Sequence, residues 1–293
     1  MKLASPYYAG IIFAAVAALG LGAITTQAKI VYSDGSNALT LMLMRFLLST
    51  LVFGALLMFG KTGFRVEKSR RIDLLLIGLI WSVAMICYLS SVETISVSLA
   101  VLILYAYPLL VLCFSIVNRL LPLSMPLVLL FLAAFSGLYL ALSGATMSVN
   151  LNGIMFAALA SLGATYTFIR GAVVAPKMSP LVMTFWINLI GLFVILPLMP
   201  GKLLLPENSV AIIALSAATL FYVIAILCQF EALARLPAAM AAFVLNLEPV
   251  ISILLAMLVL NEILSTIQWV GVVMVVSAVL LSIRFKPESV DRG

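Results

Sequence analysis

Ten apolar segments of membrane length, arranged as two sets of five, constrain this chain more than any other feature. The chain is 65% hydrophobic and only 9% charged, whereas a water-soluble domain has about 25% charged residues. A helix needs about 20 apolar residues to cross the hydrocarbon core of a bilayer. The sequence therefore predicts an all-α integral membrane protein with ten transmembrane helices. The predicted spans are residues 6–28, 38–59, 72–91, 95–117, 123–142, 151–170, 180–199, 209–233, 237–260 and 265–284.

The two sets of spans predict an inverted repeat. Because five is odd, the second set must enter the bilayer from the opposite side to the first. We expect residues 1–145 and 146–293 to form two five-helix repeats of inverted topology around a central cavity. Many secondary transporters build a midplane substrate site in this way. Since nearly all connectors are short, the spans themselves must make the site.

Internal sequence similarity supports the repeat. A shift of 141 residues places Ala84 on Ala225 and Pro108 on Pro249, and a shift of 143 residues aligns the first span with the sixth. These two spans carry small residues at every fourth position, a pattern that lets membrane helices approach closely. We interpret the stripes as packing surfaces. They are Gly10, Ala14, Ala18 and Gly22 in one span, and Gly153, Ala157, Ser161 and Thr165 in the other.

Pro108 and Pro249 lie near the middle of their spans. Proline removes one backbone hydrogen bond and clashes with the preceding turn, so it kinks a helix. A static kink is common in membrane helices. Its occurrence at equivalent places in both halves favours a pair of hinges.

The placement of basic residues predicts the orientation. With the N-terminus inside, the inner segments hold thirteen Lys and Arg residues, and the outer segments hold only Lys29 and Lys202. This asymmetry follows the positive-inside rule and predicts that both termini are cytoplasmic. Topology and anionic lipid headgroups explain the basic loop 61–71, so nucleic acid is not an expected partner. The thirteen are Lys2, Lys61, Arg65, Lys68, Arg70, Arg71, Arg119, Arg170, Lys177, Arg235, Arg284, Lys286 and Arg292.

Two repeat-related helix faces carry aromatic and amide groups. Trp81, Met85 and Tyr88 share one face of the third span, and Tyr222 and Gln229 share the equivalent face of the eighth. Each face runs about 10 Å through its span, so interfacial aromatic belts do not explain both ends. We expect these faces to be opposite walls of one substrate cavity. Further candidate residues in other spans are Tyr105, Tyr107, Tyr166 and Asn246.

Glu248 and Arg45 are the ionisable residues that lie well inside spans. A charge at this depth is costly unless it is paired or hydrated. A structural ion pair between the two and a proton-coupling role for Glu248 remain alternatives.

The composition also limits the chemistry. The chain has no histidine, and its three cysteines all lie in spans, so neither a metal site, a cofactor nor a disulfide framework is expected. An intramembrane enzyme is disfavoured for the same reason. Because the spans contain no cluster of Lys and Arg, phosphate esters are poor candidate substrates. Aromatic walls with a few amides suit a small neutral molecule or an organic cation.

At this point the chain resembles the drug/metabolite transporter superfamily, specifically its EamA-like members with ten spans. The segments that carry the resemblance are AVLILYAYPLLVLCFSIV at 100–117, AAFVLNLEPVISILLAMLVLNE from 241, and LNEILSTIQWVGVVMVVSAVLL from 260. Within the superfamily it looks most like the YddG-type exporters of aromatic and other amino acids. The resemblance implies an exporter of the bacterial cytoplasmic membrane, with a central cavity lined chiefly by spans 1, 3, 4, 6, 8 and 9.

The combined expectation is a secondary transporter that exports amino acids, aromatic or neutral, and similar metabolites by alternating access. A multidrug efflux pump for lipophilic or quaternary cations is the main alternative, because it would share the fold. A channel or a lipid scramblase is a further alternative, and saturable counterflow would distinguish a carrier from either.

Overall fold

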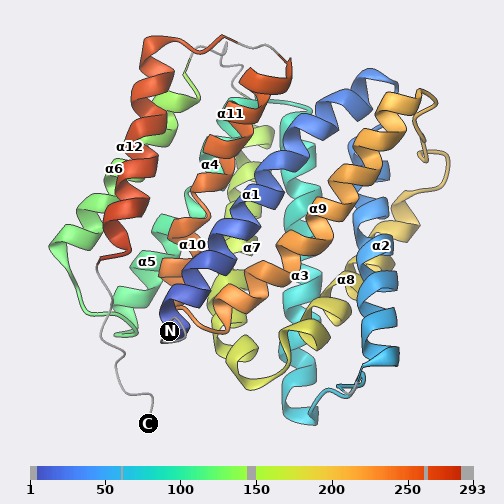
Figure 1. The fold of residues 1–293 in the computed structure, drawn as a ribbon, viewed down its shortest axis with the longest axis horizontal. Coiled ribbons are helices and arrows are strands. Elements are labelled where there is room, and N and C mark those ends of the chain that lie inside the picture. The colour runs from blue at the N-terminus through green and yellow to red at the C-terminus, as the bar shows by residue number, and fades with distance from the viewer. Residues whose placement is uncertain (1–4, 61, 144–149, 261–262, 285–293) are drawn as a thin grey trace.

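The computed structural model describes residues 5–60, 62–143, 150–260 and 263–284. Lys2, Lys61, Lys286 and Arg292, together with the predicted repeat boundary at 145/146, lie outside the described residues. Within them the chain is helical, and the long helices lie side by side in one bundle (Figure 1). The helices are α1 (Pro6–Ser33), α2 (Ala38–Phe59), α3 (Arg71–Val92), α4 (Val97–Leu104), α5 (Tyr107–Val117), α6 (Met125–Ala141), α7 (Leu151–Val174), α8 (Pro180–Ile195), α9 (Ser209–Leu233), α10 (Ala238–Val244), α11 (Leu247–Leu260) and α12 (Thr266–Ser282), with short 3₁₀ segments at Lys68–Arg70, Ala175–Lys177 and Leu196–Leu198.

Eight helical stretches of the described chain are long and apolar enough to cross a membrane. Two of them, Val97–Val117 and Ala238–Leu260, combine the helix pairs α4–α5 and α10–α11. The remaining predicted spans correspond to α6 and α12, which have 17 residues each. At about 1.5 Å per residue these two helices reach only the lower limit for crossing the hydrocarbon core. The count of ten spans is therefore plausible and stays a prediction.

The first predicted span ends too early. We expected it to stop at residue 28, but α1 continues to Ser33. Val31 is fully buried, so the helix retains an inward apolar face after Lys29, and it ends where Asp34 and Gly35 form a turn. Gly35 has φ of 85°, a conformation that glycine adopts without strain.

Both mid-span prolines coincide with a break in the helix. α4 ends at Leu104 and α5 starts at Tyr107, and α10 ends at Val244 and α11 starts at Leu247. The predicted disruption at Pro108 and Pro249 is thus confirmed, and it is an interruption instead of a bend. In both halves the last turn tightens to a three-residue hydrogen bond, at 3.2 Å from Ala106 N to the Ile103 carbonyl and at 3.1 Å from Asn246 N to the Phe243 carbonyl.

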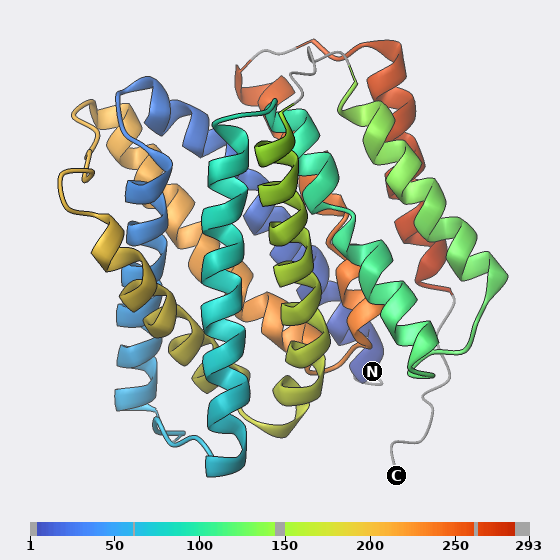
Figure 2. The same ribbon diagram turned by 180° about the vertical axis from the view of Figure 1, so that it is seen from behind.

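The two halves pack on each other in matching pairs. α1 lies against α9, and its counterpart α7 lies against α3; α2 lies against α9 and α8 against α3. α6 and α12 stand side by side at one edge of the bundle (Figures 1 and 2). In both views α7 runs opposite to α1, α9 opposite to α3, and α12 opposite to α6.

Glycine contacts match the sequence shifts residue by residue. A Cβ on Gly20 would lie 2.8 Å from the Ala225 Cβ, and one on Gly163 would lie 2.6 Å from the Ala84 Cβ. The shifts of 143 and 141 residues turn the first contact into the second. The stripe glycines behave in the same way, because Gly10 packs on Leu236 and Gly153 packs on Ile95. The packing role predicted for the stripes is confirmed.

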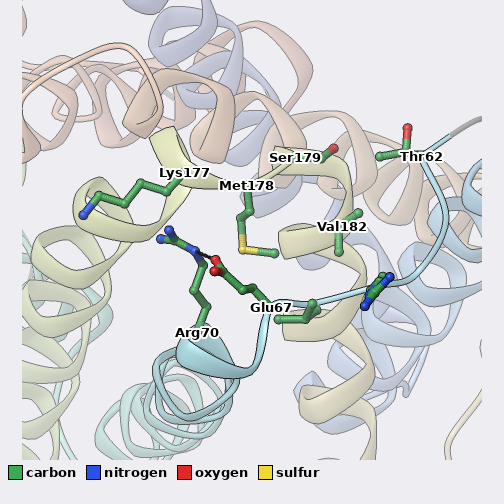
Figure 3. Close-up of a pocket in the computed structure, with 9 residues that line it drawn as sticks. Thr62, Glu67, Arg70, Lys177, Met178, Ser179 and Val182 are labelled. Atoms are coloured by element: carbon green, nitrogen blue, oxygen red, sulfur yellow. Dashed lines mark hydrogen bonds and ion pairs between the residues drawn. The ribbon is translucent and has the colours of Figure 1, made fainter.

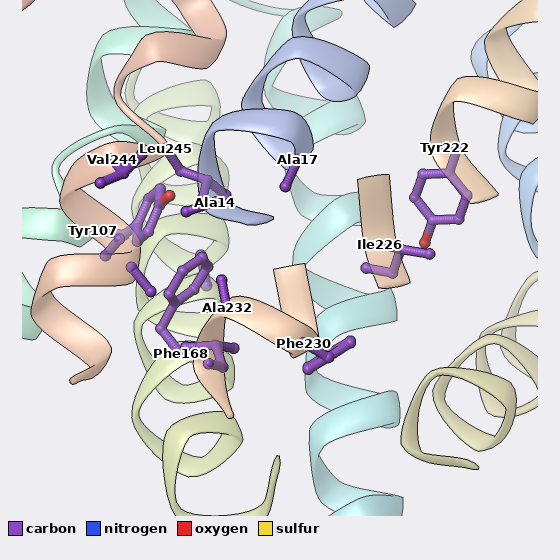
Figure 4. Close-up of a cluster of buried hydrophobic side chains, with 14 of the residues drawn as sticks. Ala14, Ala17, Tyr107, Phe168, Tyr222, Ile226, Phe230, Ala232, Val244 and Leu245 are labelled. Atoms are coloured by element: carbon purple, nitrogen blue, oxygen red, sulfur yellow. The ribbon is translucent and has the colours of Figure 1, made fainter. Parts of the chain in front are cut away.

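The buried core draws residues from both halves. Tyr107 of α5 and Phe168 of α7 have ring centroids 4.9 Å apart, and they lie close to Ala14 and Leu245 (Figure 4). The three cysteines are free thiols, as expected, but Cys113 is exposed on the surface of the bundle.

We predict that Gly20→Ala and Gly163→Ala each lower the thermal unfolding midpoint of the protein in detergent. Alanine favours a helix over glycine by about 0.8–1.0 kcal/mol, but here its Cβ would overlap another backbone-anchored Cβ, and such overpacking costs about 1–3 kcal/mol. Ala55→Val, at an exposed position of α2, is the matched control and should leave the midpoint unchanged. A raised midpoint for Gly163→Ala would contradict the packing.

Candidate functional site

The predicted site residues are enclosed within the bundle. Tyr222 and Gln229 on α9 are only 4% and 1% exposed, and Tyr105 and Asn246 at the two helix breaks are also buried. Trp81, Met85 and Tyr166 are half-buried against the same core, and Tyr88 is half-buried beside α4. The expected central cavity therefore takes the form of a closed region, in which side chains of both halves surround the polar groups.

Several of these enclosed side chains have polar atoms without a hydrogen-bond partner in the described part of the chain. They are the indole Nε1 of Trp81, the hydroxyl of Tyr222, both amide atoms of Gln229 and Nε of Arg45. Figure 4 shows the Tyr222 hydroxyl pointing toward Ile226 along α9. Leaving a buried polar group unpaired costs about 1–3 kcal/mol, so such groups are commonly reserved for water or a ligand.

Arg45 lies beside this region, with its guanidinium carbon 5.7 Å from the centroid of the Tyr222 ring. That distance is within the range of a cation–π interaction. The charge of α2 is thus placed against α9, which belongs to the other half of the chain.

Arg45 and Glu248 do not form a direct ion pair. The ion pairs within the described residues are Glu67–Arg70, Asp73–Arg170 and Glu231–Arg235. The two mid-span charges are nevertheless close enough to interact electrostatically. The predicted contact is opened because aromatic side chains surround both groups. Tyr32, Tyr88 and Tyr222 surround Arg45, and Tyr88, Tyr105 and Tyr107 surround Glu248.

Tyr32 is the member of this cluster that the sequence analysis missed. It lies near the end of α1, beyond the residue at which the predicted span stopped. The signal was the apolar stretch that resumes after Lys29, since Ile30 and Val31 extend the helical pattern toward Tyr32.

Two other polar side chains have structural partners. Asn246 donates its amide N–H to the Phe243 carbonyl at 3.0 Å and so satisfies the end of α10. Trp186 donates its indole N–H to the Phe64 carbonyl at 3.1 Å. The expected role of Asn246 in the cavity wall is therefore accompanied by a role in holding the helix break.

The two ends of the bundle differ. At the end where α2 is joined to α3, a pocket of about 230 Å³ lies between the connectors of the two halves (Figure 3). Arg65, Glu67 and Arg70 line it from one half, and Lys177 and Met178 line it from the other. We name this the basic end, because the predicted inner Lys and Arg residues belong to its connectors and adjoining helix ends.

At the opposite end, hydrogen bonds fasten the connector 34–37 and the start of α2 to the connector 199–208. Each bond joins the first half of the chain to the second, and we name the set the far-end latch. It consists of Ser36 Oγ to Leu204 O at 2.6 Å, Asn37 Nδ2 to Lys202 O at 2.8 Å, Leu204 N to Thr40 Oγ1 at 3.0 Å, and Glu207 N and Asn208 N to Asp34 Oδ2 at 2.7 and 2.9 Å. The far end is thus closed while the basic end holds a pocket.

Comparison with known proteins identifies the family. The model of the EamA-like transporter family matches residues 8–143 and again residues 151–284, nearly the whole chain. The chain belongs to the EamA-like transporter family. A comparison with curated proteins gives no match. A solved structure titled "Crystal structure of protein" aligns with a TM-score of 0.77 and 18% identity, over 91% of this chain and 95% of the other. At that identity the likeness concerns the fold.

An EamA-like chain is a multi-pass membrane protein that transports small molecules, and its family is not enzymatic. A partner in the form of a small-molecule substrate follows from the family, as does a lipid bilayer around the apolar helices. The finer expectation of a YddG-type aromatic exporter receives no support from these comparisons.

Unpaired polar atoms in this EamA-like bundle predict opposite stability effects at two buried amides. Gln229→Leu should leave the unfolding midpoint in detergent unchanged or raise it, because leucine removes two unpaired groups. Asn246→Ala should lower the free energy of unfolding by about 0.5–1.5 kcal/mol, because it removes a formed hydrogen bond. Thermal unfolding of both purified variants checks this contrast. A large loss of stability in Gln229→Leu would show that the Gln229 amide is a structural group.

Proposed function

We propose that this protein is a secondary transporter that exports amino acids, aromatic or neutral, and similar small metabolites across the bacterial cytoplasmic membrane by alternating access. One observation carries the proposal: the unpaired polar atoms of Trp81, Tyr222 and Gln229 are buried between the two halves of the chain. A substrate with hydrogen-bonding groups would supply the missing partners. Met85, Tyr105 and Tyr166 would contribute the apolar walls that a small organic molecule needs.

The difference between the two ends supports alternating access. The far-end latch joins the halves by hydrogen bonds, and the pocket at the basic end leaves them apart. The opposite state would break the latch and close the basic end. Pro108 and Pro249 would serve as hinges, because each follows a helix break at which the backbone can change its dihedral angles with little loss of hydrogen bonding.

Charge placement supports the direction. The connectors and helix ends of the basic end carry most of the Lys and Arg residues, which favours a cytoplasmic position for that end. With this orientation, the pocket would face the cytoplasm and the latch would face outward. Both termini would be cytoplasmic.

Export of quaternary or lipophilic cations is the competing function. The guanidinium of Arg45 beside Tyr222 places a positive charge next to the aromatic wall. A permanent cation bound there would be repelled, so this contact favours a substrate that also carries a negative group. Competition by a quaternary ammonium compound is thus an outcome that would favour the rival.

Counterflow in proteoliposomes tests the proposal. We expect the wild-type protein to exchange a labelled aromatic amino acid in a saturable manner, and Trp81→Ala to reduce the initial rate by at least about 10-fold, as expected when a contact to the substrate worth more than about 1.4 kcal/mol is lost. Trp269→Ala is the matched control, because Trp269 is 41% exposed on α12. Its rate should equal that of the wild type.

Two results would contradict the proposal. Equal rates for Trp81→Ala and the wild type would remove Trp81 from the substrate site. Absence of counterflow for every amino acid, with transport of a quaternary ammonium compound, would replace amino-acid export by the rival function.

A further inference from the structure

Arg45 and Glu248 are opposite charges that the fold brings near each other without letting them meet. Arg45 comes from α2 in the first half, and Glu248 comes from the first turn of α11 in the second. They interact electrostatically, yet Arg45 Nε has no hydrogen-bond partner in the described part of the chain, and neither residue belongs to an ion pair there.

This arrangement is costly without a ligand. A charge within the bilayer is normally neutralised by direct contact with its opposite. Here the guanidinium rests on the face of the Tyr222 ring at 5.7 Å, and Tyr88 interacts with both charged groups. Each charge therefore keeps a free hydrogen-bonding position beside the aromatic wall of Trp81 and Tyr222.

We infer that Arg45 and Glu248 are the two poles of a zwitterion site, in which Arg45 binds the carboxylate of an α-amino acid and Glu248 binds its ammonium group. The inference rests on the proposed function and names the substrate class of the same site. An α-amino acid carries both charges on one carbon, so a single ligand completes the interrupted pair. The guanidinium donates two parallel hydrogen bonds to a carboxylate, a geometry that lysine does not offer.

The site then selects by charge. A simple organic cation would satisfy Glu248 but leave Arg45 unpaired and repelling it, and a simple organic anion would do the reverse. The substrate side chain would lie against Trp81 and Tyr222, and Gln229 on the same face of α9 would offer its unpaired amide to a polar substituent. Because the two poles come from different halves, binding would draw the halves together around the ligand.

Three probes with the same side chain test the site: L-phenylalanine, 2-phenylethylamine, which lacks the carboxylate, and 3-phenylpropanoate, which lacks the ammonium group. Dissociation constants are measured by isothermal titration calorimetry on the purified full-length protein in detergent. We expect the wild type to bind phenylalanine at least about 10- to 100-fold more tightly than either analogue, as the loss of a hydrogen bond to a charged group predicts.

Substitution should change the two preferences separately. Arg45→Gln should weaken phenylalanine by a similar factor without weakening 2-phenylethylamine, and Glu248→Gln should weaken phenylalanine without weakening 3-phenylpropanoate. Arg45→Lys keeps the positive charge and should recover part of the phenylalanine affinity. Trp269→Ala is the control for all three probes and should bind them as the wild type does.

The outcomes separate this inference from the proposed function. If the wild type exchanges amino acids but binds the three probes with equal affinity, the zwitterion site is overturned and amino-acid export stands. Equal weakening of all three probes by Arg45→Gln also overturns it, even with the wild-type fold retained. If the wild type neither binds phenylalanine nor exchanges any amino acid, the proposed function fails, and the inference fails with it.

Discussion

The absence of water from the bilayer interior is the constraint on which the rest of this structure depends. Every backbone amide and every buried polar side chain must find a partner within the protein. The long helices meet this demand for the backbone, and hydroxyl groups such as those of Ser82 and Ser115 meet it by bonding to a carbonyl one turn earlier. The exceptions, Trp81, Tyr222, Gln229 and Arg45, are therefore informative, because they retain unpaired atoms in the environment where these cost most.

Close helix packing makes these exceptions possible. Gly20 and Gly163 let α1 and α7 approach α9 and α3 through equivalent contacts, and both contacts join one half of the chain to the other. The same faces of α9 and α3 carry Tyr222 and Trp81. A symmetric scaffold thus holds a chemically asymmetric centre, with a cation supplied by the first half and a carboxylate by the second. The ends are asymmetric too, since the far-end latch has its hydrogen bonds formed while the basic end has a pocket.

Much of the fold could be predicted from the sequence because the bilayer imposes simple rules. Apolar length located the spans, and the bounds of α2 and α9 agree with the predicted ones. Pro108 and Pro249 located the two helix breaks, because proline acts on its own preceding turn. The extension of α1 to Ser33 was missed, and Tyr32 with it, because a hydropathy pattern ends at Lys29 although the helix buries the next turn.

The site was harder to predict for a physical reason. The spacing of Trp81, Tyr222 and Gln229 indicates a shared face, but whether a polar atom is paired depends on three-dimensional contacts. Asn246 and Gln229 look alike in sequence, yet only Asn246 reaches a carbonyl. Likewise the sequence suggested that Arg45 and Glu248 meet, because it does not reveal the tyrosines that surround them.

Fluorescence of Trp81 tests the central claim most directly, namely that the two halves enclose a shared substrate site next to this residue. The chain has three tryptophans, so replacing Trp186 and Trp269 by phenylalanine leaves Trp81 as the sole indole reporter in a protein whose counterflow must be retained. The account predicts a saturable change in emission when a transported amino acid is added, with the same concentration dependence as counterflow. Retained counterflow with no change in Trp81 emission would contradict it.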